Sequence, residues 1–340
     1  MNNLKKLGLT ALAGSLAVTG ANATEYAVTG DAVLKYASID YPAGAESTFG
    51  KGLGVDTDLY FNASGELDNG FTVAFFQAAD TNGAWTNSSS QVTIGMGSLG
   101  TLKVNNIAGA AGNGIDDVMP AAYNETWDGL ALTSDNPSFF GSSTASGSVT
   151  YSIPSQEMMG LTINASVDYD PASDVSSTTA GGVNATNRTG TALVLKIDHE
   201  SGLSIGAGTE EIDNGGTKSA TSTGNDEKNV TAYVKYAAGP VSVGYQEAYN
   251  NNANGAADNE ADFWAIAYSA GDFSVSYGES TLSNHQLGNS TVVERKNESI
   301  QATYTMGAMT LGAALSETSN AAGVAARKYE ETELSVSFAF

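Results

Sequence analysis

The feature that most constrains this chain is an alternation of apolar and polar residues, repeated in short runs along most of its length. From Leu53 to Ala63, one set of alternate residues is largely apolar, and the other set contains Gly, Asp, Tyr and Asn. Successive side chains of a β-strand point to opposite faces, so such runs predict strands with one apolar and one polar face. Similar runs occur at 25–38, 161–169, 230–236, 300–306 and 331–340. The chain is therefore predicted to be all-β.

Two kinds of connection alternate between these runs. Short turns, which suit tight hairpins, are predicted near 68–70, 97–101, 154–160, 199–202, 238–240, 269–272 and 306–308. Long polar loops are predicted near 39–52, 79–90, 105–147, 170–189, 210–229, 247–261, 279–296 and 317–327. Seven short turns and eight long loops make 15 connections and hence 16 strands. An even number of strands, with short turns at one end and long loops at the other, is typical of a transmembrane antiparallel up-and-down β-barrel.

The third long connection, residues 105–147, is the longest segment without clean alternation. An irregular insert of this length is uncommon in a compact domain and usually has a function. We expect it to fold into the lumen and to narrow a pore whose wall is formed by the rest of the chain.

The first 23 residues have the pattern of a cleaved signal peptide. Lys5 and Lys6 precede a short, mostly apolar run, and Ala21-Asn22-Ala23 is a small-x-small cleavage site. The mature barrel is therefore expected at 24–340. No mature segment approaches 18 consecutive apolar residues, so no transmembrane helix is predicted.

The charge of the mature chain excludes several classes of partner. The leader holds two of the 14 basic residues and none of the 37 acidic ones, which leaves a formal charge of −25. Nucleic-acid binders present clustered Lys and Arg, and anionic membrane surfaces attract basic segments. The composition instead suits a surface that concentrates cations. With no cysteine in an exported chain, stability must come from a large hydrogen-bonded architecture and not from disulfides.

Aromatic residues lie where a membrane barrel needs them. Interfacial girdles of aromatic residues flank the apolar band of such barrels. Tyrosines recur at the ends of the apolar faces, at Tyr26, Tyr36, Tyr151, Tyr169, Tyr236, Tyr268, Tyr277 and Tyr304. The last strand ends the chain on an aromatic residue, Phe340.

From the leader to the last residue, the chain resembles the general diffusion porins of Gram-negative outer membranes. The resemblance rests on the leader, the opening strand Val28–Ala32, the hairpin Gly97–Leu102, the long connection after it, and Phe340. It implies a 16-strand barrel that assembles as a homotrimer among outer-membrane lipids. It also implies that the third loop enters the lumen and that the outer-membrane assembly machinery reads Phe340. The implied function is passive diffusion of ions and small hydrophilic solutes, without catalysis.

The resemblance also implies a constriction in which third-loop acids face basic residues of the wall. The candidate loop acids are Asp116, Asp117, Glu125 and Asp128. The candidate wall cations, all on lumen-facing positions, are Lys35, Lys103, Lys196 and Lys235. Each loop acid has the alternative of a solvated loop position, and each lysine the alternative of an ion pair within the wall.

One departure from the family pattern concerns ion selectivity. Family members usually place an arginine cluster opposite the loop, whereas the arginines here, Arg188, Arg295 and Arg327, lie in or beside long loops. Acids on lumen-facing positions add negative charge, at Asp31, Asp56, Asp58, Asp168 and Asp198. We therefore predict a weak to moderate preference for cations.

Other chemistry has little support in the sequence. The two histidines, His199 and His285, have no cysteine and no obvious second ligand, so a zinc site is not predicted. The run 250–255 mimics a calcium loop but lacks its first Asp and its final Glu, so calcium remains open only at clustered acids such as Asp116 and Asp117. Two alternatives are an outer-membrane barrel enzyme that uses one of the histidines beside a serine, and a secreted β-rich adhesin.

Overall fold

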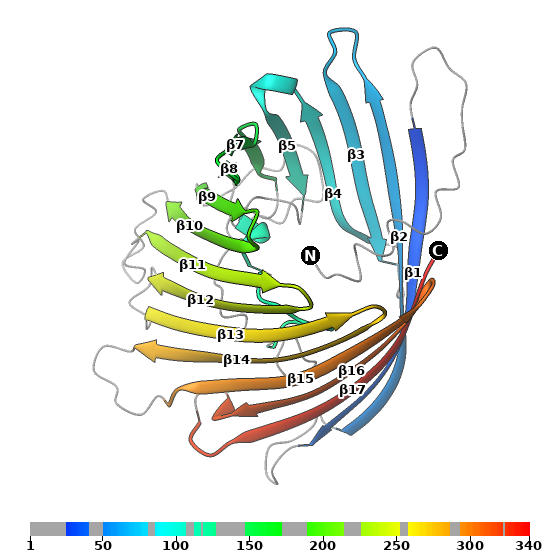
Figure 1. Ribbon diagram of the computed structural model, residues 1–340, viewed down its shortest axis with the longest axis vertical. Coiled ribbons are helices and arrows are strands. Elements are labelled where there is room, and N and C mark those ends of the chain that lie inside the picture. The colour runs from blue at the N-terminus through cyan, green and yellow to red at the C-terminus, as the bar shows by residue number, and fades with distance from the viewer. Residues whose placement is uncertain are drawn as a thin grey trace, which may run out of the picture.

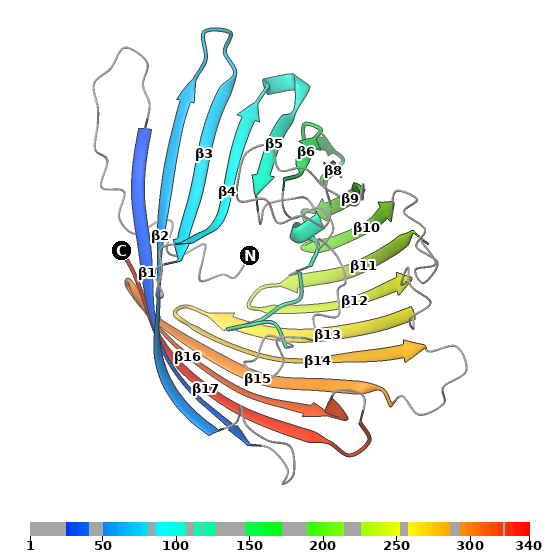
Figure 2. The ribbon, with the colours of Figure 1, turned by 180° about the vertical axis from the view of Figure 1, so that it is seen from behind.

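In a computed structural model, the chain forms one closed ring of antiparallel strands (Figures 1 and 2). The structure describes residues 25–40, 50–80, 86–106, 112–116, 118–126, 147–171, 189–213, 226–251, 258–285, 293–321 and 324–340. Within these ranges, no helix is long and apolar enough to cross a membrane. The predicted leader, residues 1–23, lies outside them.

The strands follow one another around the ring in chain order. The first eight are β1 (Glu25–Asp40), β2 (Gly50–Glu66), β3 (Thr72–Asp80), β4 (Thr86–Gly95), β5 (Thr101–Asn106), β6 (Val149–Ser152), β7 (Gln156–Met158) and β8 (Leu161–Asp170). The others are β9 (Thr189–His199), β10 (Leu203–Asp213), β11 (Glu227–Ala238), β12 (Val241–Asn251), β13 (Asp258–Ala270), β14 (Phe273–His285), β15 (Arg295–Met306), β16 (Met309–Ser319) and β17 (Lys328–Ala339). Two short 3-10 turns, η1 (Gly97–Leu99) and η2 (Gly112–Gly114), complete the described elements.

The predicted fold class is confirmed. Although 17 segments are in strand conformation, β6 and β7 both pair with β8 and form one interrupted strand, so the barrel has 16 strands. The ring closes where β1 pairs with β17, with Asp31 opposite Ala339 and Asp40 opposite Glu330. The interruption corrects the predicted turn at 154–160. Residues 156–158 still pair with β8, and the turn itself is confined to Met159 and Gly160, which have positive φ angles.

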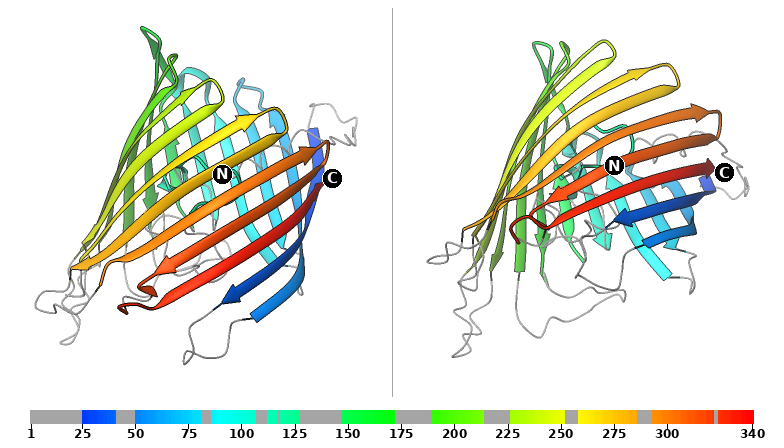
Figure 3. Two further views of the ribbon diagram at one scale, coloured as in Figure 1. Left: turned by 60° about the horizontal axis from the view of Figure 1, so that its bottom comes forward. Right: turned by 90° about the horizontal axis from the view of Figure 1, so that it is seen from below.

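The two faces of the wall differ as the alternation predicts. Exposed apolar residues occupy the outward positions, as in β11, where Val230, Val234 and Tyr236 are exposed while Thr231 and Tyr233 are buried. Six of the eight predicted girdle tyrosines are exposed on outward positions: Tyr26, Tyr151, Tyr169, Tyr236, Tyr268 and Tyr304. The short connections between β10 and β17 lie together at one end of the barrel (Figure 3).

Several strands extend further toward the long loops than the apolar pattern predicts. β10 runs to Asp213, β12 to Asn251 and β14 to His285. Outward ion pairs join neighbouring strands in these extensions, for example Lys228 with Glu211 and Lys328 with Glu317. Cross-strand pairs of opposite charge stabilise a ladder as apolar pairs do. The loops are correspondingly shorter than predicted.

Candidate functional site

The described part of the third connection, residues 112–116 and 118–126, lies against inward-facing side chains of the wall. Its first turn reaches β8 and β9, where the Gly112 amide donates to Asp168 Oδ2 (2.9 Å) and the Lys196 ammonium donates to the Gly114 carbonyl. On β12, Gln246 Nε2 donates to the Ile115 carbonyl (3.1 Å). These bonds satisfy backbone groups that an irregular segment would otherwise leave unpaired.

The second half of the segment continues along the same wall toward the closure of the barrel. The amide of Ala122 donates to Ser276 Oγ on β14 (2.8 Å). The amides of Tyr123 and Asn124 both donate to Gln301 Oε1 on β15, at 3.1 and 2.9 Å. The segment thus follows the inner wall from β8 toward β17. We call the inward faces of β8–β17 the loop arc, and the inward faces of β2–β5 the opposite arc.

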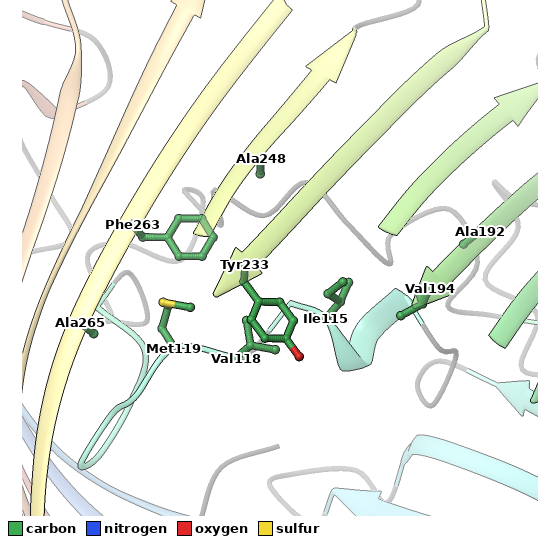
Figure 4. Packing of buried hydrophobic residues seen from close by; sticks show 9 residues of the cluster. All are labelled: Ile115, Val118, Met119, Ala192, Val194, Tyr233, Ala248, Phe263 and Ala265. Carbon is green, nitrogen blue, oxygen red and sulfur yellow. The ribbon is translucent and has the colours of Figure 1, made fainter. Parts of the chain in front are cut away.

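An apolar cluster fixes the segment to the loop arc. Its members are Ile115, Val118 and Met119 from the loop, and Ala192, Val194, Tyr233, Ala248, Phe263 and Ala265 from the wall (Figure 4). Ile115 is fully buried, and Phe263 is 1% exposed. Each fully buried side chain of this size contributes about 1.5–3 kcal/mol relative to exposure. A barrel lumen is usually polar, so this cluster is a small core formed by loop and wall together.

Glycines in the wall leave room for the loop. A Cβ on Gly244 of β12 would lie 2.9 Å from Met119 Sδ, and one on Gly312 of β16 would lie 2.7 Å from the Tyr123 ring. Both distances are shorter than a side chain tolerates. The inward positions of β12 and β16 are therefore shaped to receive Met119 and Tyr123.

Tyr123 forms the far anchor of the segment, next to the closure of the barrel. Its hydroxyl donates to Glu333 Oε1 on β17 (2.5 Å), and the same oxygen accepts from Lys35 Nζ on β1 (2.9 Å). Lys35 Nζ also lies 6.0 Å from the centroid of the Tyr123 ring, within the range of a cation–π contact. Burial, together with the hydrogen bond to Glu333, raises the pKa of the Tyr123 hydroxyl. The hydroxyl therefore remains a donor at neutral pH.

The predicted loop acids are placed as follows. Asp116 is half-buried just after η2, and Glu125 is buried, with 7% of its surface exposed. Asp117 and Asp128 lie outside the described residues. Their role in a constriction stays a prediction.

The predicted wall lysines fall into two groups. Lys196 of β9 and Lys235 of β11 lie on the loop arc, and Lys196 donates to the loop backbone at Gly114. Lys35 pairs with Glu333, an acid of the wall. Lys103 of β5, on the opposite arc, forms no ion pair with any described residue. The wall-pair alternative therefore applies to Lys35.

The lumen-facing acids also divide between the arcs. Asp168 is fully buried and accepts from the Gly112 amide and from Thr150 Oγ1 (2.5 Å), so it anchors the loop. Asp31 and Asp58 face each other across β1 and β2, and the Tyr60 hydroxyl donates to both, at 2.8 and 3.4 Å. Asp80 of β3 is opposite Asp58. These three acids form a polar surface that runs from β1 into the opposite arc.

Sequence reasoning missed the wall residues that hold the loop, chiefly Gln246, Gln301 and Glu333. Polar residues at lumen-facing positions are expected in any barrel, so their residue types did not distinguish them as contacts of the loop. The inward Gly244 and Gly312 were the available signal, because glycine inside a strand often marks a close approach of other chain atoms.

The histidines and candidate metal ligands form no further centre in the described ranges. His199 Nδ1 lies 2.7 Å from Ser201 Oγ in a short turn, with no carboxylate hydrogen bond to its ring among the described contacts. β9 ends at His199 before a short turn, whereas β14 ends at His285 before a long connection, so the two lie at opposite ends of the barrel. No group of three or more metal-ligating side chains occurs among the described residues.

The family model described as Gram-negative porin matches residues 8–337. Similar solved structures include a porin (14% identity, TM-score 0.61, 93% of this chain and 100% of that chain) and a loop-deletion mutant of Vibrio cholerae OmpT (12%, 0.62, 93% and 99%). Salmonella typhi OmpF in complex with daunomycin is also similar (12%, 0.66, 93% and 98%). No curated protein sequence matches this chain.

Proposed function

This chain belongs to the Gram-negative porin family, and on that premise we propose that it passes ions and small hydrophilic solutes by passive diffusion, with a weak to moderate preference for cations. The coarser conclusion, an outer-membrane porin channel, follows from the family and from the closed barrel. The one observation that carries the proposal is the division of the wall into an apolar outer face and a polar inner face. Passive conduction needs a polar bore of chosen width and charge.

The wall acids support the cation preference. Asp31, Asp58 and Asp80 lie in register on three neighbouring strands of the inner wall. Fixed negative charge along a pore raises the local concentration of cations. The buried Asp168, in contrast, accepts two hydrogen bonds and contributes less negative potential to the bore.

Planar-bilayer recordings of the detergent-purified mature protein test this proposal. We expect steady ohmic conductance steps, and a reversal potential in a KCl gradient with the sign of cation preference. The opposite sign would overturn the charge argument. Silence from protein that is shown to be folded and inserted would overturn the pore itself, and the enzyme and adhesin alternatives would then lead.

We also propose a homotrimer. Outward positions of β3, β4 and β5 near the long loops carry uncharged polar side chains, Gln77, Ser90 and Asn106, and Asn106 Nδ2 donates to Ser90 Oγ (3.3 Å). Polar groups that face hydrocarbon are costly, so contact with a second copy would explain their position. Conductance steps that arrive in threes, and a heat-dissociable trimer on gels, are the expected results.

Export and assembly complete the proposal. The leader pattern at residues 1–23 supports cleavage after Ala23, and a mature N-terminus at Thr24 is the expected result of N-terminal sequencing. Phe340 supports recognition by the outer-membrane assembly machinery, and its backbone exchanges hydrogen bonds with Gly30 at the closure. No catalytic step is proposed, and double replacement of His199 and His285 is expected to leave conductance unchanged.

A further inference from the structure

Two aromatic rings stand on the inner wall of the opposite arc, where a porin bore is normally lined by polar groups. Tyr60 of β2 and Phe76 of β3 lie with ring centroids 6.2 Å apart and ring planes inclined by 18°. Both positions are inward, because Phe76 pairs with Asn62 and Tyr60 pairs with Ala78 in the same register. Both side chains are partly exposed.

Two other inward aromatic residues of the described wall, Tyr233 and Phe263, hold the loop. Tyr233 is 7% exposed and Phe263 is 1% exposed, and both belong to the apolar cluster beneath Ile115, Val118 and Met119. The described loop contacts fall on the loop arc and on Lys35 of β1. Tyr60 and Phe76 therefore have no comparable packing role toward the described loop.

The surroundings of the two rings combine three kinds of recognition. The Tyr60 hydroxyl is bonded to the carboxylates of Asp31 and Asp58, which places negative charge at one edge of the rings. Asn62 and Gln91 flank Phe76 in register and place amides at the other edge. Ring faces attract ammonium groups through their quadrupole and stack with flat organic groups. Carboxylates add Coulombic attraction for the same cation.

We infer that Tyr60 and Phe76 form a solute-binding patch in the bore that selects organic cations carrying an aromatic ring. The inference rests on the proposed pore function and goes beyond it by naming a solute class and a place on the wall. Solutes with both a ring and an ammonium group can stack on the rings and pair with the carboxylates at once, so they dwell longest, whereas a ringless cation lacks the stacking contribution. The patch gives the bore a chemical preference that charge alone does not supply.

Current block in planar bilayers tests the inference. The probes are phenethylammonium, tetramethylammonium and neutral 2-phenylethanol, each added to wild type and to Phe76→Leu. We expect wild type to be half-blocked by phenethylammonium at the lowest concentration of the three probes. Phe76→Leu should raise that concentration about two- to twelve-fold, the effect of one lost ring–ring contact, and should raise the half-blocking concentration of tetramethylammonium by a smaller factor.

A neighbouring residue provides the matched control. Phe75 precedes Phe76 in β3 but faces outward and is 39% exposed, so Phe75→Leu removes the same ring from the other face of the wall. Equal half-blocking concentrations of phenethylammonium for the Phe75→Leu and Phe76→Leu pores would overturn the patch. If Phe76→Leu does not fold, as judged by heat-modifiability, Tyr60→Leu is measured in its place with the same criterion. Wild-type silence would refute the pore itself, whereas conduction without ring-dependent block would refute only the patch.

Discussion

The loop arc and the opposite arc are built from the same alternating strands, yet they present different chemistry to the bore. On β9–β13 the inward residues include Ala192, Gln246 and Phe263, all buried against the third connection. On β2–β5 the inward residues include Asp58, Phe76 and Lys103, all partly exposed. The same periodicity therefore produces a surface that binds the third connection on one side of the bore and a solute-facing wall on the other.

The difference comes from side-chain size and from the hydrogen bonds that each arc must satisfy. Glycine and alanine on the loop arc leave space for loop side chains. Glutamine amides there bond to loop backbone groups. The opposite arc keeps charged and aromatic groups, which attract water and solutes. The same type of substitution should therefore change the free energy of unfolding when it is made on the loop arc, and solute permeation when it is made on the opposite arc.

The largest expected difference in stability comes from placing the same side chain at one glycine of the loop arc and at one glycine of the opposite arc. Gly312→Val would push against Tyr123 and Ser335 Oγ, because a Cβ there would lie 2.7 and 2.5 Å from them. Such overpacking costs about 1–3 kcal/mol. We expect a lower free energy of unfolding, faster proteolysis of the loop and noisier single-channel current.

Gly52→Val is the matched control, because a Cβ at Gly52 on the inward side of β2 has nothing within 4 Å. We expect it to unfold like wild type in urea. Equal losses of stability in both variants would show that the loop arc does not pack specifically against the third connection.

A smaller effect is expected from two isosteric replacements of wall carboxylates. Asp168→Asn weakens the bond to the Gly112 amide and should cost about 1 kcal/mol, with little change in reversal potential. Asp58→Asn removes charge from a partly exposed position and should shift the reversal potential toward zero without loss of stability. Urea unfolding and bilayer recordings on both variants check that Asp168→Asn changes stability and that Asp58→Asn changes the reversal potential. A selectivity change in Asp168→Asn alone would reverse the assignment of the two arcs.

The sequence predicted the barrel because each strand run carries its own alternation. Leu53–Ala63 already separates the residues that face the membrane from those that face the bore. The loop contacts were beyond such reasoning, since Tyr123 and Glu333 are 210 residues apart and meet only when the ring closes. Pairing Lys35 with an acid of the wall likewise needed the β1–β17 register. Strand ends were predicted too short, because outward charges such as Lys228 looked like loop residues.

The smallest effect expected on the loop arc concerns pH and the Tyr123 anchor. The free tyrosine pKa is about 10, and burial with the bond to Glu333 raises the pKa of Tyr123 in the folded protein. Above pH 10 the unfolded chain loses this proton while the folded chain keeps it, so the folded state binds more protons and stability falls as pH rises. The stability advantage of wild type over Tyr123→Phe should shrink by about 0.8 kcal/mol between pH 8 and pH 10.5. Urea unfolding of both proteins at the two pH values measures this difference, in which the other tyrosines cancel. An advantage that stays constant would mean that the hydroxyl is not held by Glu333, and the far anchor of the loop would have to be sought in the Gln301 bonds alone.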